Sequence, residues 1–168
     1  MREDVEVKQT IPTIDLDQFR FGDRTQQSQV VACLGHALED YGFLAIENHG
    51  VNTDVVRLAY GAMRAFFALP EKTKAQYERR EIGRQRGYTP FGKERAKNRR
   101  TADIKEFWHS GPEINPSDPV FDRLPTNVWP REIPSFRPAI INLWSELAAC
   151  GNAVLKALAR HLGAEEEF

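Results

Sequence analysis

Four histidines and two cysteines are the first candidates in this sequence for binding a metal ion or attacking a substrate. The four histidines are His36, His49, His109 and His161. His49 stands in a predicted turn, and its neighbours offer no second metal ligand at a workable spacing, so we interpret it as a structural residue. The two cysteines, Cys33 and Cys150, each fall in an amphipathic helical pattern, which predicts buried free thiols. Two cysteines also exclude a four-cysteine zinc site.

A cationic segment is the second candidate for chemistry. From Arg79 to Arg100 it holds nine Lys or Arg and two Glu, although the net charge of the chain is only -1. A solvated surface loop, a lid that attracts an anionic substrate and a nucleic-acid contact all fit this composition. Aromatic residues do not alternate with the basic ones as they do on surfaces that stack on bases, which disfavours nucleic acid.

Length and composition favour one soluble globular domain. The chain has 168 residues, of which 41% are hydrophobic, and a domain typically has about 100–200 residues. No apolar run approaches the roughly 20 residues of a membrane-spanning helix. The charged N-terminus, Met1 to Lys8, is unlike a secretory signal. We therefore expect a cytoplasmic protein with no membrane partner.

The first fifty residues predict two strands with a helix between them. The residues Ile11 to Leu16 alternate in polarity as in a short strand. The apolar spacing from Thr25 to Tyr41 predicts a helix, and Tyr41 belongs to its predicted inner face. Gly42 can end this helix in a left-handed cap. The segment Phe43 to Glu47 then predicts a buried strand that pairs with the strand at 11–16. Phe43 is the residue expected to anchor it in the core.

The rest of the chain predicts helices, two more strands and a long loop. In order, these are a helix capped by Asn52 or Thr53, a short helix from Leu69-Pro70-Glu71 to about Tyr77, a strand in Gly87 to Pro90, a strand in Asp103 to His109, a loop from Gly111 to Pro134 and a long helix at about 137–162. The predicted inner face of the long helix contains Ile140, Trp144, Leu147, Gly151, Val154, Leu158 and Leu162. This face needs a large partner surface and offers a site for self-association.

Seven short segments occur in an order that is more specific than any one of them. The longest is GFLAIENHGV at 42–51. The others are IPTIDL at 11–16, FFALPEKTK at 66–74, RGYTPFGKE at 86–94, DIKEFW at 103–108, NVWP at 127–130 and ALARHLG at 157–163. Together they resemble the N-terminal region of the isopenicillin N synthase-like iron(II)/2-oxoglutarate-dependent oxygenases.

The resemblance implies an α+β fold in which helices and short strands flank a double-stranded β-helix (jelly-roll) barrel. It implies an oxidoreductase that uses Fe(II) and 2-oxoglutarate, and that hydroxylates, desaturates or cyclises a small molecule. In the family, the strand and turn at 87–92 approach the substrate entrance, which makes Arg86, Tyr88 and Glu94 candidate substrate contacts. The alternative is a tyrosine packed on its sheet, with the arginine and glutamate facing solvent.

The iron-binding motif of that family is absent from this sequence. The family binds iron through His-x-Asp/Glu and a later His, and anchors 2-oxoglutarate through Arg-x-Ser. Here no histidine is followed two positions later by Asp or Glu, and no arginine by Ser. In the family these motifs lie in the C-terminal jelly roll, which the four predicted strands cannot close.

Residues 1–168 are therefore expected to be the N-terminal dioxygenase domain, with the C-terminal jelly-roll domain missing. We expect no catalytic or metal-binding residue in this chain, no Fe(II) or 2-oxoglutarate bound by it alone, and no activity without the missing part. Two other functions stay open. One is a stand-alone, non-catalytic interaction domain, and the other is an anion- or nucleic-acid-binding protein that uses Arg79 to Arg100.

Overall fold

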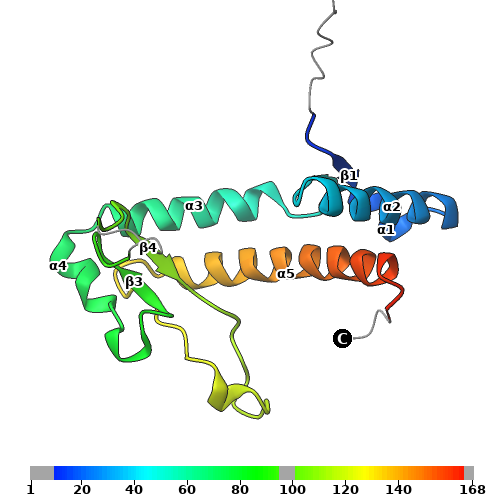
Figure 1. Ribbon diagram of the computed structural model, residues 1–168. Coiled ribbons are helices and arrows are strands. Elements are labelled where there is room, and N and C mark those ends of the chain that lie inside the picture. Colours follow the sequence, from blue (N-terminus) through cyan, green and yellow to red (C-terminus); the bar gives the residue numbers. More distant parts are fainter. Residues whose placement is uncertain (1–9, 95–100, 165–168) are drawn as a thin grey trace, which may run out of the picture. The chain divides into compact units, whose positions relative to one another are not determined.

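The structure is a computed structural model that describes residues 10–94 and 101–164. It has the predicted mixture of helices and short strands (Figure 1). The chain divides into two compact units rather than one. Met1–Val51 with Glu146–Phe168 form unit 1, and Asn52–Ser145 form unit 2. Helix α5, Phe136–His161, contributes its first turns to unit 2 and the remainder to unit 1.

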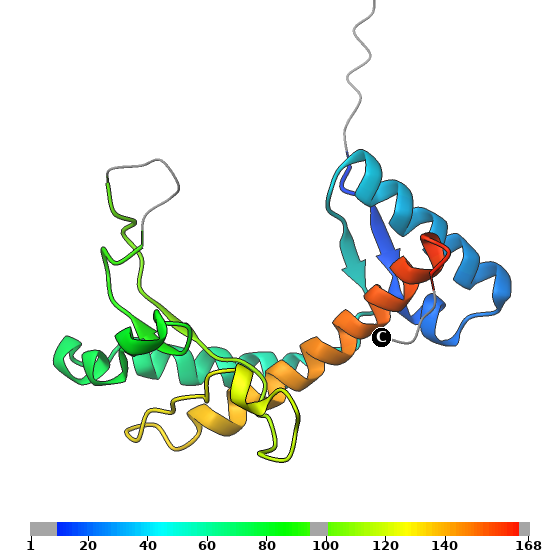
Figure 2. The same cartoon turned by 60° about the horizontal axis from the view of Figure 1, so that its bottom comes forward.

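Unit 1 contains a two-stranded parallel sheet and two helices besides its part of α5. Strand β1, Thr13–Asp15, pairs with β2, Ala45–Glu47, and the two lie side by side in Figure 2. The predicted pairing is confirmed, but the first strand is shorter than predicted. Its last residue already caps helix α1, Leu16–Phe21, because the Asp15 carboxylate accepts a hydrogen bond from the backbone N–H of Asp17 at 3.0 Å.

Helix α2, Arg24–Asp40, has a defined signal at each end. Asp23 and Gln26 form a capping box at its start, in which each side chain accepts a hydrogen bond from the other residue's backbone N–H. At its end Gly42 has a φ of +77°, and its N–H donates to the carbonyls of Ala37 and Leu38. The predicted left-handed cap is confirmed at a position where glycine avoids the strain of a side chain.

Three predicted buried residues of unit 1 are exposed. Phe43 is 55% exposed and Tyr41 45% exposed, so the predicted anchor of β2 and the predicted end of the inner helical face are wrong. Cys33 is exposed as well, although both cysteines are free as predicted. The inner face of α2 follows Val30, Leu34 and Ala37, and position 33 lies about 100° away from position 34 around the helix. Phe43 lies two residues before β2, and within the described residues no residue of β2 is fully buried, whereas Ile14 of β1 is 2% exposed.

Unit 2 begins with helix α3, Thr53–Phe67, and continues through short helical pieces to a hairpin. The pieces before the hairpin are α4 at Glu71–Lys74, η1 at Ala75–Tyr77 and η2 at Arg80–Ile82, and η3 at Phe121–Arg123 follows it. Asn52 caps α3 and Pro70 precedes α4, as predicted. Strand β3, Gly87–Thr89, pairs antiparallel with β4, Phe107–His109. The second strand is therefore shorter than the predicted Asp103 to His109.

The long helix α5 agrees with the predicted bounds and with part of the predicted face. Ile140 is buried and Val154 and Leu158 pack against the unit 1 core, whereas Trp144, Leu147 and Leu162 are 41%, 52% and 69% exposed. The prediction is wrong for these three because the apolar residues of α5 extend beyond one face, and periodicity alone does not select the side that packs. Within the described residues, no helix is long and apolar enough to cross a membrane.

Candidate functional site

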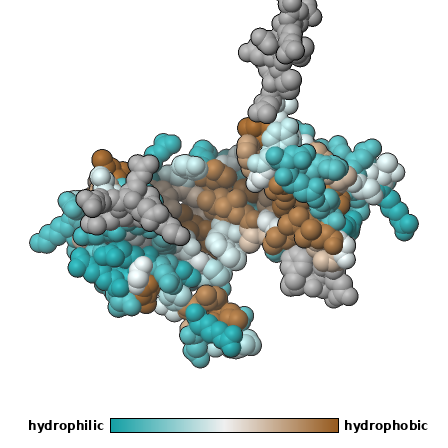
Figure 3. Space-filling model, viewed as in Figure 1, coloured by the Kyte–Doolittle hydropathy of each residue, from teal (hydrophilic) through white to brown (hydrophobic). Residues whose placement is uncertain are grey.

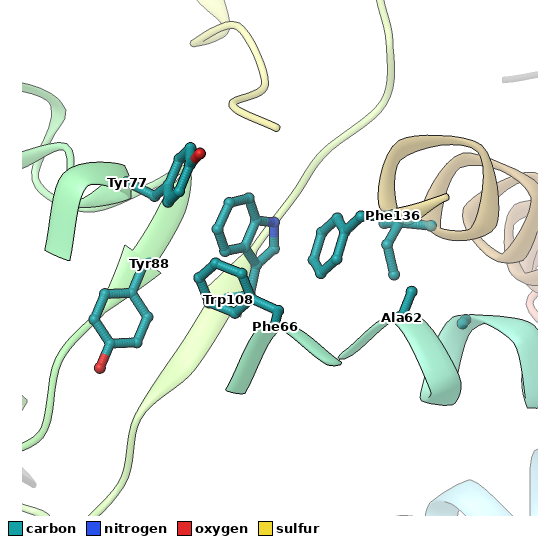
Figure 4. Close-up of a cluster of buried hydrophobic side chains, with 8 residues drawn as sticks. Ala62, Phe66, Tyr77, Tyr88, Trp108 and Phe136 are labelled. Carbon is teal, nitrogen blue, oxygen red and sulfur yellow. The ribbon is translucent and has the colours of Figure 1, made fainter. Parts of the chain in front are cut away.

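The hairpin of unit 2 is built on an aromatic core (Figure 4). Phe66, at the end of α3, is fully buried, and its ring centroid lies 4.7 Å from Trp108 and 5.8 Å from Tyr88. Trp108 also contacts Phe136, the first residue of α5, at 4.9 Å. These pairs are edge-to-face, the geometry that favours aromatic contact. The core fixes β3 and β4 against α3 and the start of α5.

A buried polar cluster lies beside this core. The Lys74 ammonium is 2.7 Å from Glu106 Oε2, and the Tyr88 hydroxyl donates to the same oxygen at 2.5 Å. Lys74 Nζ also donates to the carbonyl of Phe67 at 3.3 Å. Only 9% of the Lys74 side chain and 16% of the Glu106 side chain are exposed. Two hydrogen bonds to one carboxylate oxygen compensate for much of the cost of burying these charges.

The cluster fixes the protonation of its tyrosine. Burial, and then the hydrogen bond to Glu106, raise the pKa of Tyr88 well above its usual value of 10.0. The hydroxyl therefore stays neutral and donates to the carboxylate at physiological pH. A tyrosine in this state orients a strand and does not act as a base.

Close backbone packing explains why β3 begins with a glycine. Gly87 has a φ of +79°, and a Cβ there would lie 2.3 Å from the carbonyl oxygen of Tyr77. The Tyr77 hydroxyl in turn donates to Glu132 at 2.6 Å and accepts from the backbone N–H of Arg131 at 2.9 Å. Burial and the Glu132 carboxylate raise the pKa of Tyr77. The hairpin is thus tied to the loop that leads to α5.

The structure does not bring the three predicted substrate contacts together. Tyr88 is 1% exposed, as in the alternative of a tyrosine packed on its sheet. Arg86 immediately precedes β3, whereas Glu94 lies beyond the far end of that strand, where it pairs with Lys105 at 2.8 Å. Arg86 is partly buried, and its guanidinium occupies the space where a Cβ on Gly111 would stand.

Buried polar atoms without a partner gather at this hairpin. Within the described residues three such side-chain atoms are Arg86 Nε, Thr89 Oγ1 and Trp108 Nε1. A buried donor left unpaired costs about 1–3 kcal/mol. Arg86 Nε is the one that belongs to a predicted substrate contact.

Ion pairs neutralise the first part of the cationic segment. Glu78, with a side chain only 7% exposed, pairs with Arg80 at 2.9 Å and Arg84 at 2.7 Å. The hydrogen bond from Arg80 lowers the pKa of Glu78, and Arg84 acts in the same direction. Arg79 lies 4.0 Å from Glu81. These contacts favour the solvated-loop interpretation for 79–84, while the basic residues at 95–100 lie outside the described residues.

The histidines with described contacts are structural. His49 Nδ1 accepts a hydrogen bond from the backbone N–H of Val51 at 3.0 Å, which confirms its predicted role in the turn. His109 Nδ1 is 3.1 Å from the carbonyl of Arg84, and His161 Nε2 is 2.9 Å from Glu39. In the described ranges no three His, Cys, Asp or Glu side chains converge as a metal site would require. These residues therefore do not fit a site of two histidines and one carboxylate for iron.

Comparison with known proteins identifies the class. Residues 11–132 match the family described as non-haem dioxygenase in morphine synthesis N-terminal, and the chain belongs to this family. It is 31% identical over 156 residues to the 2-oxoglutarate-dependent dioxygenase caaD of Aspergillus niger, covering 91% of this chain and 48% of that protein. It is 27% identical over 175 residues to isopenicillin N synthase of Penicillium rubens, covering 96% and 50%. The resemblance stated from sequence is confirmed.

A solved structure agrees with the fold. A 2OG-Fe(II) oxygenase family protein from Caulobacter crescentus matches with a TM-score of 0.81 at 34% identity, covering 95% of this chain and 50% of that one. The chain thus spans about half the length of the curated relatives that it matches.

The buried Lys74–Glu106–Tyr88 cluster was not predicted. Tyr88 and Lys74 are 18 and 32 positions away from Glu106 in the sequence, so no local sequence pattern connects the three residues.

Proposed function

We propose that this chain is the N-terminal part of an Fe(II)/2-oxoglutarate-dependent oxygenase that oxidises a small-molecule substrate. The observation that carries the proposal is the match of residues 11–132 to a family described as N-terminal, in a chain that spans about half of its relatives. Related names such as validamycin A dioxygenase and isopenicillin N synthase favour a small-molecule substrate. The reaction is a hydroxylation, a desaturation or a ring closure.

In this proposal the iron and the 2-oxoglutarate are bound by a C-terminal jelly-roll domain outside residues 1–168. The bound iron would activate dioxygen, which is the oxidant, and 2-oxoglutarate would be the electron donor that is converted to succinate and carbon dioxide. The residues of this chain do not hold either group. The aromatic core and the Lys74–Glu106–Tyr88 cluster keep the hairpin rigid. A rigid hairpin is a suitable support for a substrate entrance, because binding side chains need fixed positions.

Among the three candidate substrate contacts, Arg86 is the one that we favour. Its Nε has no hydrogen-bond partner among the described residues, although its Nη1 donates to the carbonyl of Gln85 at 2.7 Å. Tyr88, in contrast, donates to Glu106, and Glu94 pairs with Lys105. A guanidinium binds carboxylate and phosphate groups with two parallel hydrogen bonds. We propose that Arg86 contacts an anionic group of the substrate.

A stand-alone interaction domain is the second candidate function. Leu147 and Leu155 of α5 are 52% and 48% exposed, and Leu162, directly after α5, is 69% exposed. Exposed apolar side chains that lie close together favour binding to another protein surface. Self-association through α5 would follow. A nucleic-acid or anion binder is less favoured, because the arginines described at 79–84 already pair with Glu78 and Glu81.

Turnover of 2-oxoglutarate tests the proposal. We expect residues 1–168 with Fe(II), ascorbate and 2-oxoglutarate to form no succinate above the protein-free control, and the longer gene product that contains them to form it. In the longer product, Arg86→Gln should raise KM for the oxidised substrate, while uncoupled succinate formation is retained. Succinate formation by residues 1–168 alone would contradict the assignment of the iron site to another domain.

A further inference from the structure

The guanidinium of Arg86 uses only one of its three nitrogens for hydrogen bonding. Nη1 donates to the carbonyl of Gln85 at 2.7 Å. Nε is buried without a partner. Nη2 makes no hydrogen bond in the part of the chain that the structure describes, and it is not among the buried atoms without a partner, so it is open to solvent. The Nε–Nη2 edge of the planar group is therefore unused and can be reached at its Nη2 end.

Gly111 supports this guanidinium. A Cβ at position 111 would lie 2.3 Å from Arg86 Nη2, 2.7 Å from Cζ and 3.1 Å from Nε, so the group lies directly against the glycine. The backbone of Gly111 is not in the left-handed region, unlike that of Gly87 with its φ of +79°. Backbone conformation thus does not require a glycine at position 111. The space that Arg86 occupies does require it.

Asn127 fixes the backbone of Gly111 through both of its polar groups. Its Oδ1 accepts a hydrogen bond from the Gly111 N–H at 2.9 Å, and its Nδ2 donates to the Gly111 carbonyl at 2.9 Å. Nδ2 also lies 3.4 Å from the carbonyl of Pro112. A primary amide has both donors and an acceptor, so one side chain satisfies both backbone groups. A residue 16 positions along the chain therefore holds the backbone on which Arg86 lies.

The charge of Arg86 is not neutralised within the described ranges. Glu113, the carboxylate nearest to Gly111 in the sequence, pairs with Arg137 instead. The surface over α4 and the segment that leads to β3 is mostly hydrophilic (Figure 3). A positive group with an unused edge on a polar surface attracts anions from water.

We propose that Gly111, held by Asn127, positions Arg86 to bind a two-oxygen anionic group, a carboxylate or a phosphate, along its Nε–Nη2 edge. Two parallel hydrogen bonds from a guanidinium to such a group are strong and fix its orientation. One of them also gives the buried Nε the partner that it lacks. This inference rests on the proposed function, because it assigns the chemical class and the geometry of the substrate contact made by Arg86. Gly111 and Asn127 are positioning residues, since they act through the arginine.

Gly111→Ala tests the positioning without removing the arginine. The added methyl needs the place of the guanidinium, which is the end of a flexible side chain and can move at little cost to folding. Gly151→Ala is the matched control, because a Cβ there would meet no atom within 4 Å. Arg86→Gln removes the binding group, and Lys93→Gln removes an equal charge from an exposed lysine after β3. Circular dichroism verifies that the four variants remain folded.

Anion titration of residues 1–168 measures the site. Sodium acetate and inorganic phosphate are the probes, and sodium chloride at equal ionic strength is the reference. The NMR signal of the Arg86 Nε–H, assigned by its loss in Arg86→Gln, reports the contact directly. We expect wild type, Gly151→Ala and Lys93→Gln to bind alike, and Gly111→Ala to raise the dissociation constant about tenfold or more. The anion that binds more tightly identifies the class as carboxylate or phosphate.

Kinetics of the longer gene product separate positioning from a structural role. Gly111→Ala should raise KM for the oxidised substrate about tenfold with kcat retained, and it should have no further effect when Arg86 is already Gln. The proposed function fails separately, if the longer product forms no succinate, and the anion titration still decides this site. An Arg86 signal that neither anion shifts, a Gly111→Ala variant that binds like wild type, or effects of the two substitutions that add would overturn the proposal.

Discussion

The hairpin core of unit 2 and the strand–turn region of unit 1 differ in how completely their aromatic side chains are buried and their charged side chains are paired. In unit 2, Phe66, Tyr88 and Trp108 are buried together, and the charges beside them are paired. In unit 1, the segment from Tyr41 to Val51 has well-formed turns, yet Phe43 remains 55% exposed. Local signals thus define the path of the backbone in both regions. Phe66 is buried because η1, β3, β4 and α5 each supply an aromatic partner. Unit 1 buries Phe19 but does not bury Phe43.

Removing an aromatic side chain from each region should give the largest difference. Phe66→Ala deletes a fully buried ring that contacts five other rings, and such a change typically costs about 3–5 kcal/mol. Phe43→Ala should cost less than about 1 kcal/mol, because an exposed ring leaves no cavity. Urea unfolding of both variants measures the free energies of unfolding. Equal losses at the two positions would contradict the comparison.

The buried ion pair should come next in size. Glu106→Gln removes the charge that compensates Lys74, and breaking a buried pair by removing one partner costs about 3–5 kcal/mol. We expect the lower end of that range, because the amide still accepts a hydrogen bond from Tyr88. Lys105→Gln breaks an exposed pair with Glu94 and should have little effect. If thermal melts give the two variants the same midpoint, the cluster does not support the hairpin.

Glycine positions distinguish backbone strain from lost packing. Gly42→Val introduces a branched side chain at a φ of +77° and should cost about 1–2 kcal/mol, although no atom lies within 4 Å of its Cβ position. Gly61→Ala also has open space but lies within a helix, so it should stabilise the chain by up to about 1 kcal/mol. Opposite signs in denaturant melts support the left-handed cap, and a harmless Gly42→Val refutes it.

The smallest expected effect is on the alkaline limit of stability. Because the folded state raises the pKa of Tyr88 above 10.0, its contribution is complete below about pH 10 and declines as the pH rises further. Tyr88→Phe should therefore lower stability at pH 7 and flatten its decrease above about pH 10. Tyr77 retains part of the slope, since its pKa is also raised. A Tyr88→Phe profile parallel to wild type would exclude this contribution.

The sequence predicted the elements better than it predicted their burial. The predicted helix boundaries at Gly42 and Asn52 are confirmed, because both residues act through hydrogen bonds within a few residues. The capping box at Asp23 acts over the same short range but was not predicted. The packed side of α5 and the exposure of Phe43 depend on contacts between distant segments, which one sequence does not encode locally. The polar cluster was missed for the same reason. Arg86 was singled out because the motif RGYTPFGKE carried it, and its role stays a prediction.

We propose that residues 1–168 are one part of an iron- and 2-oxoglutarate-dependent oxygenase. Sequencing the natural gene beyond codon 168 tests it most directly. We expect an open reading frame that continues for a further length similar to this chain, and that encodes His-x-Asp/Glu, a later His and Arg-x-Ser. A stop codon directly after codon 168, with no second gene product that supplies these motifs to this chain, would contradict it.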